Sequence, residues 1–328
     1  MRSAEMIELW RGDMRESLHA GHAVICDAHG VVEAWGRPGQ VIYPRSSCKM
    51  IQALPLMESG AADAAGLTDR QLALACASHS GAAMHVAAVD GWLTGLGLGE
   101  PDLRCGCHMP RDADENRRLT CSDTAPCQLH NNCSGKHAGF LTLNRHLKGG
   151  PDYVEPDHPV QRAVKAAFEE VTDEESPGFG IDGCSAPNWA CTVEGLARAM
   201  ARFANPGTDR RGQAMRRLVD AMRSHPEMVA GEGRSCTELM RAMGGVAAIK
   251  TGAEAVFVAI LPDQGLGVAL KITDGGTRAS EAAITALLIH LGVLDAAHPA
   301  AQALLDGPIL NCRGMVTGNL RRAPGFPA

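Results

Sequence analysis

Strand-like segments lie at the two ends of this chain, and a long helical region separates them. The first three segments are 5–10, 23–27 and 31–35, and the last three are 246–250, 255–261 and 266–273. This segregation is typical of α+β proteins, and the short turns between the last strands favour antiparallel pairing. We therefore expect the terminal strands to form one antiparallel sheet in a single domain of residues 1–328, with a helical region of approximately residues 46–243 inserted between them.

The middle of the chain shows the helical spacing of apolar residues. Val160, Val164, Phe168 and Val171 recur at intervals of three and four residues, which places them on one helix face. The same kind of pattern predicts helices at 47–58, 68–77, 82–94, 136–147, 158–171, 192–203, 208–223 and 278–294.

Charge and hydropathy exclude two classes of protein. Lys and Arg number 31 against 37 Asp and Glu, which argues against nucleic-acid binding by phosphate neutralisation. The most apolar stretch, 282–294, is too short for a membrane span. The charged start of the chain has no apolar core, so we expect a cytoplasmic protein. In that reducing compartment most of the 12 cysteines are expected to be buried thiols.

The first candidate for chemistry is Ser46, followed three residues later by Lys49. On a helix these side chains share one face, so an uncharged Lys49 amine could take the proton from the Ser46 hydroxyl. A burial or charge effect would have to lower the lysine pKa for that role. A capping serine followed by a surface lysine is the alternative interpretation.

A second candidate is Lys250-Thr251-Gly252, at the end of a predicted strand. Gly252 allows a close approach to the backbone, and Lys250 can point into a cleft. A serine-lysine tetrad and a later Lys-Thr-Gly occur together in serine acyl-transfer enzymes. Ser78, in the turn 77–81, could supply the hydroxyl that such sites hold between two lysines.

Two polar loops that contain glycine suggest a further site. The first, 130–137, opens a helix and contains Cys133, and the second, 181–188, contains Cys184. Two thiolates can bind a soft or borderline metal such as zinc, although buried structural thiols fit the same pattern.

Five segments, in order along the chain, resemble the rhizobial type of bacterial L-asparaginase. They read RSSCKMIQALPL, CASHSGAAMH, HNNCSGKHAGFL, GIDGCSAPNWA and IKTGAEAVFVAIL. The resemblance implies a fold similar to serine β-lactamases and penicillin-binding proteins, a homodimer, and hydrolysis of L-asparagine to L-aspartate and ammonia.

The resemblance also implies roles for individual residues. It pairs Ser46 with Lys49 and Ser78 with Lys250 as the catalytic groups. It places a zinc ion on Cys133, Lys136 and Cys184, with water as a further ligand. It also places Asp182 beside them to orient that water or the substrate α-ammonium. The remaining residues predicted to bind substrate are Arg45, His137 and Gly252.

Other functions remain open at this point. A serine-dependent glutaminase acts on a substrate that is longer by one methylene, a difference that pockets distinguish poorly. Another amidase of the β-lactamase fold would use the same residues. A non-catalytic protein that binds zinc or an amino acid would keep the site without releasing ammonia.

Overall fold

The computed structural model describes residues 2–327, and the chain divides into two compact units. The first unit consists of Met1–Ser47, Cys191–Asn205 and Glu238–Ala328, and the second consists of Cys48–Ala190 and Pro206–Thr237. A single domain over residues 1–328 stays a prediction.

The first unit contains an antiparallel sheet of eight strands. They are β1 (Ala4–Arg11), β2 (Met14–Asp27), β3 (Gly30–Trp35), β8 (Ala248–Gly252), β9 (Val256–Leu261), β10 (Leu266–Ile272), β11 (Pro308–Leu310) and β12 (Val316–Arg322). Their order is β11-β12-β1-β2-β10-β9-β8, and β3 pairs with β2. Strands from both ends of the chain therefore share one sheet, which confirms the predicted α+β fold class.

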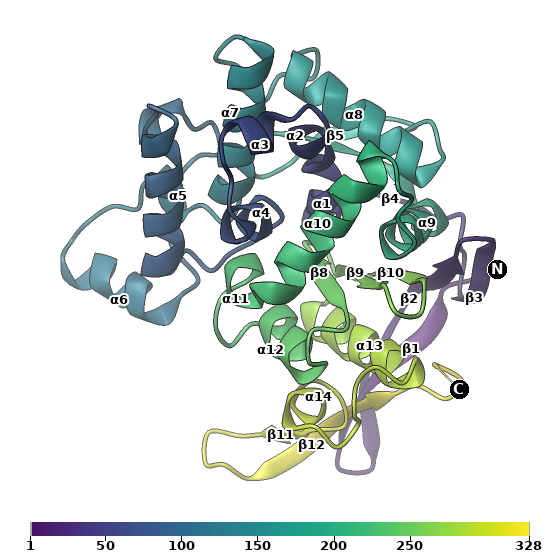
Figure 1. The fold of residues 1–328 in the computed structure, drawn as a ribbon. Coiled ribbons are helices and arrows are strands. Elements are labelled where there is room, and N and C mark those ends of the chain that lie inside the picture. Colours follow the sequence, from purple (N-terminus) through teal and green to yellow (C-terminus); the bar gives the residue numbers. More distant parts are fainter. Residues whose placement is uncertain (1, 328) are drawn as a thin grey trace. The chain divides into compact units, whose positions relative to one another are not determined.

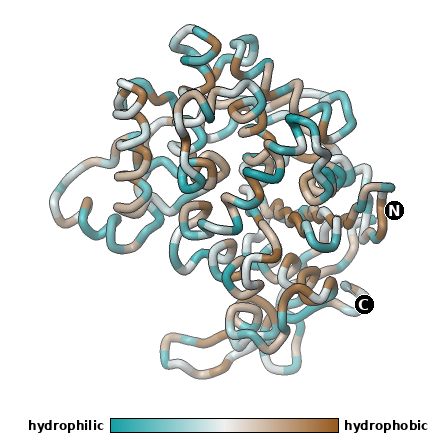
Figure 2. The backbone as a smooth tube through the Cα atoms, viewed as in Figure 1, coloured by the Kyte–Doolittle hydropathy of each residue, from teal (hydrophilic) through white to brown (hydrophobic). Residues whose placement is uncertain are grey.

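The centre of this sheet is apolar. All six residues of β9 are buried, and Figure 2 shows the hydrophobic run along the central strands. Helices α9 (Val193–Ala204) and α13 (Thr277–His290) pack against the sheet (Figure 1). Two further short elements of this unit, β4 (Val41–Ile42) and β7 (Cys191–Thr192), pair with each other.

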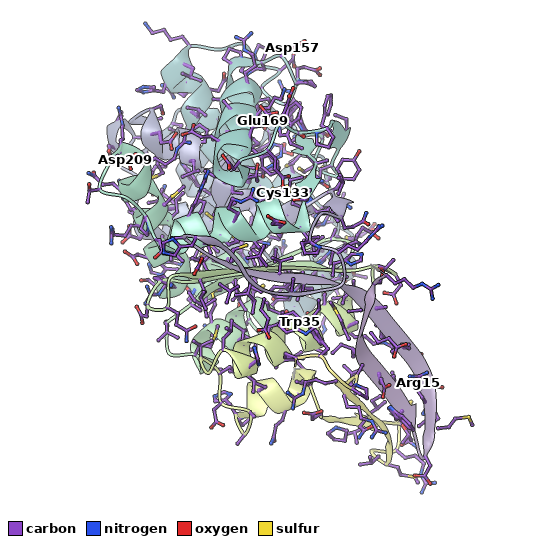
Figure 3. The ribbon with its side chains drawn as sticks, turned by 90° about the vertical axis from the view of Figure 1, so that its right-hand side faces the viewer. Arg15, Trp35, Cys133, Asp157, Glu169 and Asp209 are labelled. Carbon is purple, nitrogen blue, oxygen red and sulfur yellow. The ribbon has the colours of Figure 1, made fainter. Side chains whose placement is uncertain are left out.

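Side chains near both termini hold the edge of the first unit together. Trp35 of β3 packs edge-on against His290 at the end of α13 and against Phe326. Arg15, on the hairpin of β1 and β2, lies with its Nη1 2.9 Å from Glu8 Oε1 (Figure 3). The Trp35 contacts join segments that the sequence separates widely. The helix α14 (Pro299–Leu304) also belongs to this unit.

The second unit is mainly helical. Its helices are α1 (Lys49–Gln52), α2 (Leu54–Glu58), α3 (Ala61–Ala64), α4 (Asp69–Ala75), α5 (Ala83–Gly95), α6 (Ala113–Cys121), α7 (Ser134–Leu147), α8 (Pro159–Thr172), α10 (Arg210–Ser224) and α11 (Pro226–Val229). It also holds the 3₁₀ turns η2 (Glu100–Asp102) and η3 (Gln128–His130), and the hairpin of β5 (Phe179–Ile181) and β6 (Pro187–Trp189). The 3₁₀ helix η1 (Arg45–Cys48) and α12 (Ser235–Ala242) contain residues of both units.

The predicted helix 47–58 is broken into three short pieces: η1, α1 and α2. The Ala53 N–H still reaches the Lys49 carbonyl oxygen, but Pro55, two residues later, has no N–H to continue that ladder. The prediction of one continuous helix was therefore wrong. Within residues 2–327, no helix has the length and apolar character that a membrane span requires.

Candidate active site

Lys49, the first residue of α1, is the centre of a buried polar cluster in the second unit. Its side chain is 1% exposed. The Nζ atom donates to the carbonyl oxygen of Ala77 at 2.5 Å, to Ser78 Oγ at 3.1 Å and to Cys133 Sγ at 3.1 Å. An ammonium group has three N–H donors, so these three acceptors satisfy it fully. Two predicted site residues, Ser78 and Cys133, are thus brought to one lysine.

A close helix crossing brings these acceptors together. Ser78 follows α4, and Cys133, labelled in Figure 3, directly precedes α7. A side chain at Gly135 would place its Cβ 2.4 Å from the Leu74 carbonyl oxygen, so only glycine permits the observed approach of α7 to α4. Gly135 therefore permits the close spacing between the Ser78 loop and the Cys133 loop.

Cys184, Cys133 and Lys136 form a second buried group in the same unit. Lys136 Nζ lies 3.0 Å from Cys184 Sγ. The hydrogen bond between the Cys133 thiol and Cys184, together with the Lys136 charge, holds the pKa of Cys184 well below the ordinary thiol value. The same hydrogen bond and burial raise the pKa of Cys133 to about 12. These shifts favour the thiolate form of Cys184 and the thiol form of Cys133.

The donor atoms of this group suit a zinc ion. Burial disfavours the Lys136 ammonium, but the Cys184 and Cys133 sulfurs outweigh that effect and raise the Lys136 pKa. Two sulfurs and one amine nitrogen would provide three ligands once Cys133 and Lys136 lose their protons, and a zinc ion favours that loss. Across residues 2–327, no group of three Cys, His, Asp or Glu side chains is placed to hold a metal, so a metal at this group would require Lys136 as a ligand.

Asp182 lies in the turn that carries Cys184. The turn joins β5 to β6, its Asp182 N–H donates to the Ala186 carbonyl oxygen, and Ser185 adopts a left-handed φ of 69°. The Asp182 carboxylate opposes the charge on the Cys184 thiolate and favours the Lys136 ammonium. Asp182 therefore lies close enough to Cys184 and Lys136 to affect their charges, as predicted.

His79 connects the Ser78 loop to the Cys133 loop. Its Nδ1 accepts the Gly81 N–H at 3.2 Å, and its Nε2 lies 3.0 Å from Ser134 Oγ. Because the Ser134 hydroxyl donates to the Leu129 carbonyl oxygen, Nε2 must carry the proton and donate to Ser134. Burial lowers the pKa of His79 well below its ordinary value, so the ring is neutral. His79 is not among the site residues predicted from the sequence.

His137, a predicted substrate-binding residue, is completely buried in α7. Tyr153 Oη accepts the Arg104 N–H and lies 2.9 Å from His137 Nδ1. If the tyrosine donates to Nδ1, the Arg104 N–H, the Tyr153 hydroxyl and His137 Nδ1 each have a partner, and the His137 proton is on Nε2. That Nε2 has no hydrogen-bond partner among the described residues, which leaves a buried donor available to a bound molecule.

The other predicted residues belong to the first unit. Ser46 and Arg45 lie in η1, and Lys250 is 1% exposed on β8, with its Nζ donating to the Thr251 carbonyl oxygen at 2.7 Å. A Cβ at Gly252 would lie 2.7 Å from the Pro44 carbonyl oxygen and 3.0 Å from the Ser47 nitrogen. Gly252 thus allows the segment before Ser46 to lie directly against β8.

Comparison with known proteins gives one family match. Residues 7–322 match the sequence model of the L-asparaginase II family. No curated protein matches the chain.

Several solved structures are similar at low sequence identity. A β-lactamase from Mycobacterium bovis is 14% identical to this chain, with a TM-score of 0.46. The match covers 84% of this chain and 95% of the β-lactamase chain. Mglu in its native form is 14% identical, with a TM-score of 0.49, and the match covers 85% of this chain and 66% of the Mglu chain. An octameric penicillin-binding protein homologue from Pyrococcus abyssi is 12% identical, with a TM-score of 0.38. The match covers 83% of this chain and 73% of the homologue's chain.

The family match extends over nearly the whole chain and includes every residue of the clusters described above. It makes the chain an asparaginase-type enzyme and implies an asparagine amidohydrolase activity. On that match, the chain belongs to the L-asparaginase II family.

Proposed function

We propose that this enzyme hydrolyses the side-chain amide of L-asparagine to L-aspartate and ammonia with a lysine-activated serine, as the rhizobial-type resemblance implies. The observation that carries the proposal of a lysine base is the contact of the buried Lys49 amine with Ser78 and Cys133. The choice of Ser46 as the nucleophile rests on the resemblance and on its spacing from Lys49. A buried lysine bonded to a hydroxyl is an arrangement that proton transfer requires.

The Lys49 contacts suit both protonation states of the lysine. As an ammonium, Nζ donates to all three neighbours. As a neutral amine it would donate to Ala77 and Cys133 and accept the Ser78 proton through its lone pair. A proton can therefore move between the Ser78 hydroxyl and Lys49 without a change of partners.

We assign the nucleophile to Ser46 because it stands three residues before Lys49 in the chain. Lys49 takes the hydroxyl proton as Ser46 Oγ attacks the amide carbon, and the carbonyl oxygen becomes an oxyanion. Backbone N–H groups at Ser46 and after Lys250 are the proposed oxyanion donors. The proton returns to the leaving nitrogen, ammonia departs, and water hydrolyses the resulting aspartyl ester. Ser78 and Lys250 are the proposed proton relay.

We assign the metal site to Cys133, Lys136 and Cys184, the residues whose donor atoms suit zinc. When bound there, zinc would supply a positive charge for a polar group of the substrate. Asp182 and the buried His137 Nε2–H are the polar groups proposed to orient a water molecule beside this site. We also propose a homodimer, which sedimentation velocity would test.

Ammonia release and trapping of the ester test the proposal together. The purified enzyme should release ammonia from L-asparagine faster than from L-glutamine, and Ser46→Ala should lose at least 100-fold in kcat, about the effect of losing an activated nucleophile. Ser122→Ala, at the exposed end of α6, is the control. Rapid quenching and mass spectrometry should find the aspartyl ester on the peptide with Ser46. An ester only on Ser78, or near-normal turnover of Ser46→Ala, would overturn the assignment.

A further inference from the structure

The first unit contains a cavity of about 430 Å³, a volume in the range of small-molecule sites. Residues from β2, β10 and the segments before Ser46 and after Lys250 line it. The lining residues that the argument uses are Arg37, Arg45, Glu254 and Lys271.

Cationic side chains outnumber acidic ones in the cavity lining. Arg37, Arg45 and Lys271 bring three positive charges to it, and Glu254 brings one carboxylate. Burial and the nearby Arg45 charge lower the pKa of Lys271, although Glu254 opposes them. A bound anion would offset the repulsion between Lys271 and Arg45.

Two of these residues have unusual backbone conformations. Arg45 has a φ of 53° and Glu254 a φ of 57°, both in the left-handed region that non-glycine residues seldom adopt. The Lys271 Nζ donates to the Glu254 carbonyl oxygen, which ties the Glu254 turn to β10. The Glu254 conformation belongs to the hairpin turn between β8 and β9, where Ala255 also has a φ of 57°. Arg45 lies outside such a turn, and strained backbone of its kind is often retained where a side chain has to face a ligand.

The cavity adjoins the residue to which we assign the nucleophilic attack. Arg45 directly precedes Ser46, and both belong to the first unit. Gly252 of β8 contacts Pro44 and Ser47 in the same unit, so the segment that carries Arg45 is fixed against the sheet. A ligand in the cavity would therefore lie beside the start of η1.

We propose that this cavity binds the zwitterionic end of an α-amino acid, with its α-carboxylate between Arg45 and Lys271 and its α-ammonium at Glu254. The inference rests on the proposed function for the identity of the amino acid. Charge-assisted hydrogen bonds from Arg and Lys are the strong contacts that proteins make to carboxylates, and Glu254 supplies the opposite charge for the amine.

Calorimetric titration tests the site without turnover. L-Aspartate is compared with two analogues: β-alanine lacks the α-carboxylate, and succinate lacks the α-ammonium. The unmodified enzyme should bind L-aspartate about tenfold or more tightly than either analogue, the ratio expected for one lost charged contact. Lys271→Met should remove the preference over β-alanine, and Glu254→Gln should remove the preference over succinate. Arg313→Gln, an exposed charge change in the same unit, should leave all three affinities unchanged.

The outcomes separate this inference from the proposed function. If L-aspartate binds and both variants lose their preferences, the cavity assignment stands even for an enzyme that releases no ammonia from asparagine. Ammonia release with unaltered affinities in Lys271→Met would overturn the cavity assignment and leave the activity intact. Failure of L-aspartate to bind, or equally strong competition by inorganic phosphate, would also overturn it. Circular dichroism of each variant confirms that it is folded.

Discussion

His79 Nε2 lies 3.0 Å from Ser134 Oγ and donates its proton to that oxygen. The bond connects the residue after Ser78 to the residue after Cys133. Because Lys49 contacts both Ser78 and Cys133, a shift between these two loops would change the surroundings of the lysine amine. His79 is therefore a positioning residue for the proposed base.

Removal of the His79 ring should slow turnover in a folded enzyme. We expect His79→Ala to lower kcat about tenfold or more with a smaller effect on KM, and to destabilise the fold by about 2 kcal/mol, since a buried hydrogen bond and packing are both lost. His79→Gln keeps an N–H donor and should recover part of the kcat loss. Steady-state kinetics and thermal unfolding measure these effects. Equal kcat values in all three proteins would contradict the positioning role.

Metal content should depend on the two sulfurs of the proposed zinc site. Protein purified without added zinc should contain about one zinc per chain by elemental analysis, and Cys133→Ala combined with Cys184→Ala should contain none. Cys312→Ala, which changes an exposed thiol, is the matched control. Chelation should raise KM for L-asparagine more than it lowers kcat. Full activity in the double variant would contradict a role for the metal in the reaction.

A side chain at Gly252 should disturb the segment that carries Ser46. The added Cβ would stand 2.7 Å from the Pro44 carbonyl oxygen, and backbone atoms cannot rotate away as a side chain can. We expect Gly252→Ala to cost about 1–3 kcal/mol of stability and to lower kcat more than tenfold. Gly91→Ala, inside α5, has open space around the new Cβ and should keep wild-type turnover, and it should raise stability by up to about 1 kcal/mol because alanine favours a helix. Wild-type turnover in Gly252→Ala would refute this account of the glycine.

Glu115 should make stability depend on pH. The Arg118 hydrogen bond, with help from His130, outweighs burial and holds the pKa of Glu115 below 4.5. The folded state therefore favours the carboxylate, and its stabilisation is complete above the ordinary Glu pKa and is lost as pH falls through the lower folded value. Glu115 also anchors His130, three residues before Cys133, so the effect concerns the loop of the metal group.

Urea unfolding at about pH 6 and about pH 3.5 measures this dependence, because the two values bracket the ordinary pKa of a glutamate. Glu115→Gln should lose about 1 kcal/mol at the higher pH and less at the lower one. Asp114→Asn, on the exposed side of the same helix, should keep the wild-type dependence. A difference that grows on acidification would contradict the sign of this prediction.

Local patterns in the sequence predicted much of the fold. The terminal strands and their common sheet followed from alternating and short apolar segments, and helices such as α8 followed from apolar spacing. The strand β12 was missed because its sequence, VTGNLRR, is largely polar and none of its residues is buried. The break after α1 was missed because apolar spacing continues through Pro55.

The site was only partly predictable for a different reason. The spacing of Ser46 and Lys49 is visible within four residues, but the bond between Lys136 and Cys184 joins positions 48 residues apart. Nothing in the local sequence distinguishes Lys136 from a surface lysine, and only the resemblance to a family selected it. The proton positions on His79 and His137 depend on partners from other loops, which no spacing rule contains.

The most direct measurement of the central claim is the turnover of Lys49→Met on L-asparagine. Methionine fills a similar volume without an amine, and Lys148→Met, at the exposed end of α7, is the matched control. If Lys49 is the base, its replacement should lower kcat about 100- to 10,000-fold in a folded protein, while the control keeps wild-type turnover. Ammonia release by folded Lys49→Met at a rate within twofold of wild type would contradict the account.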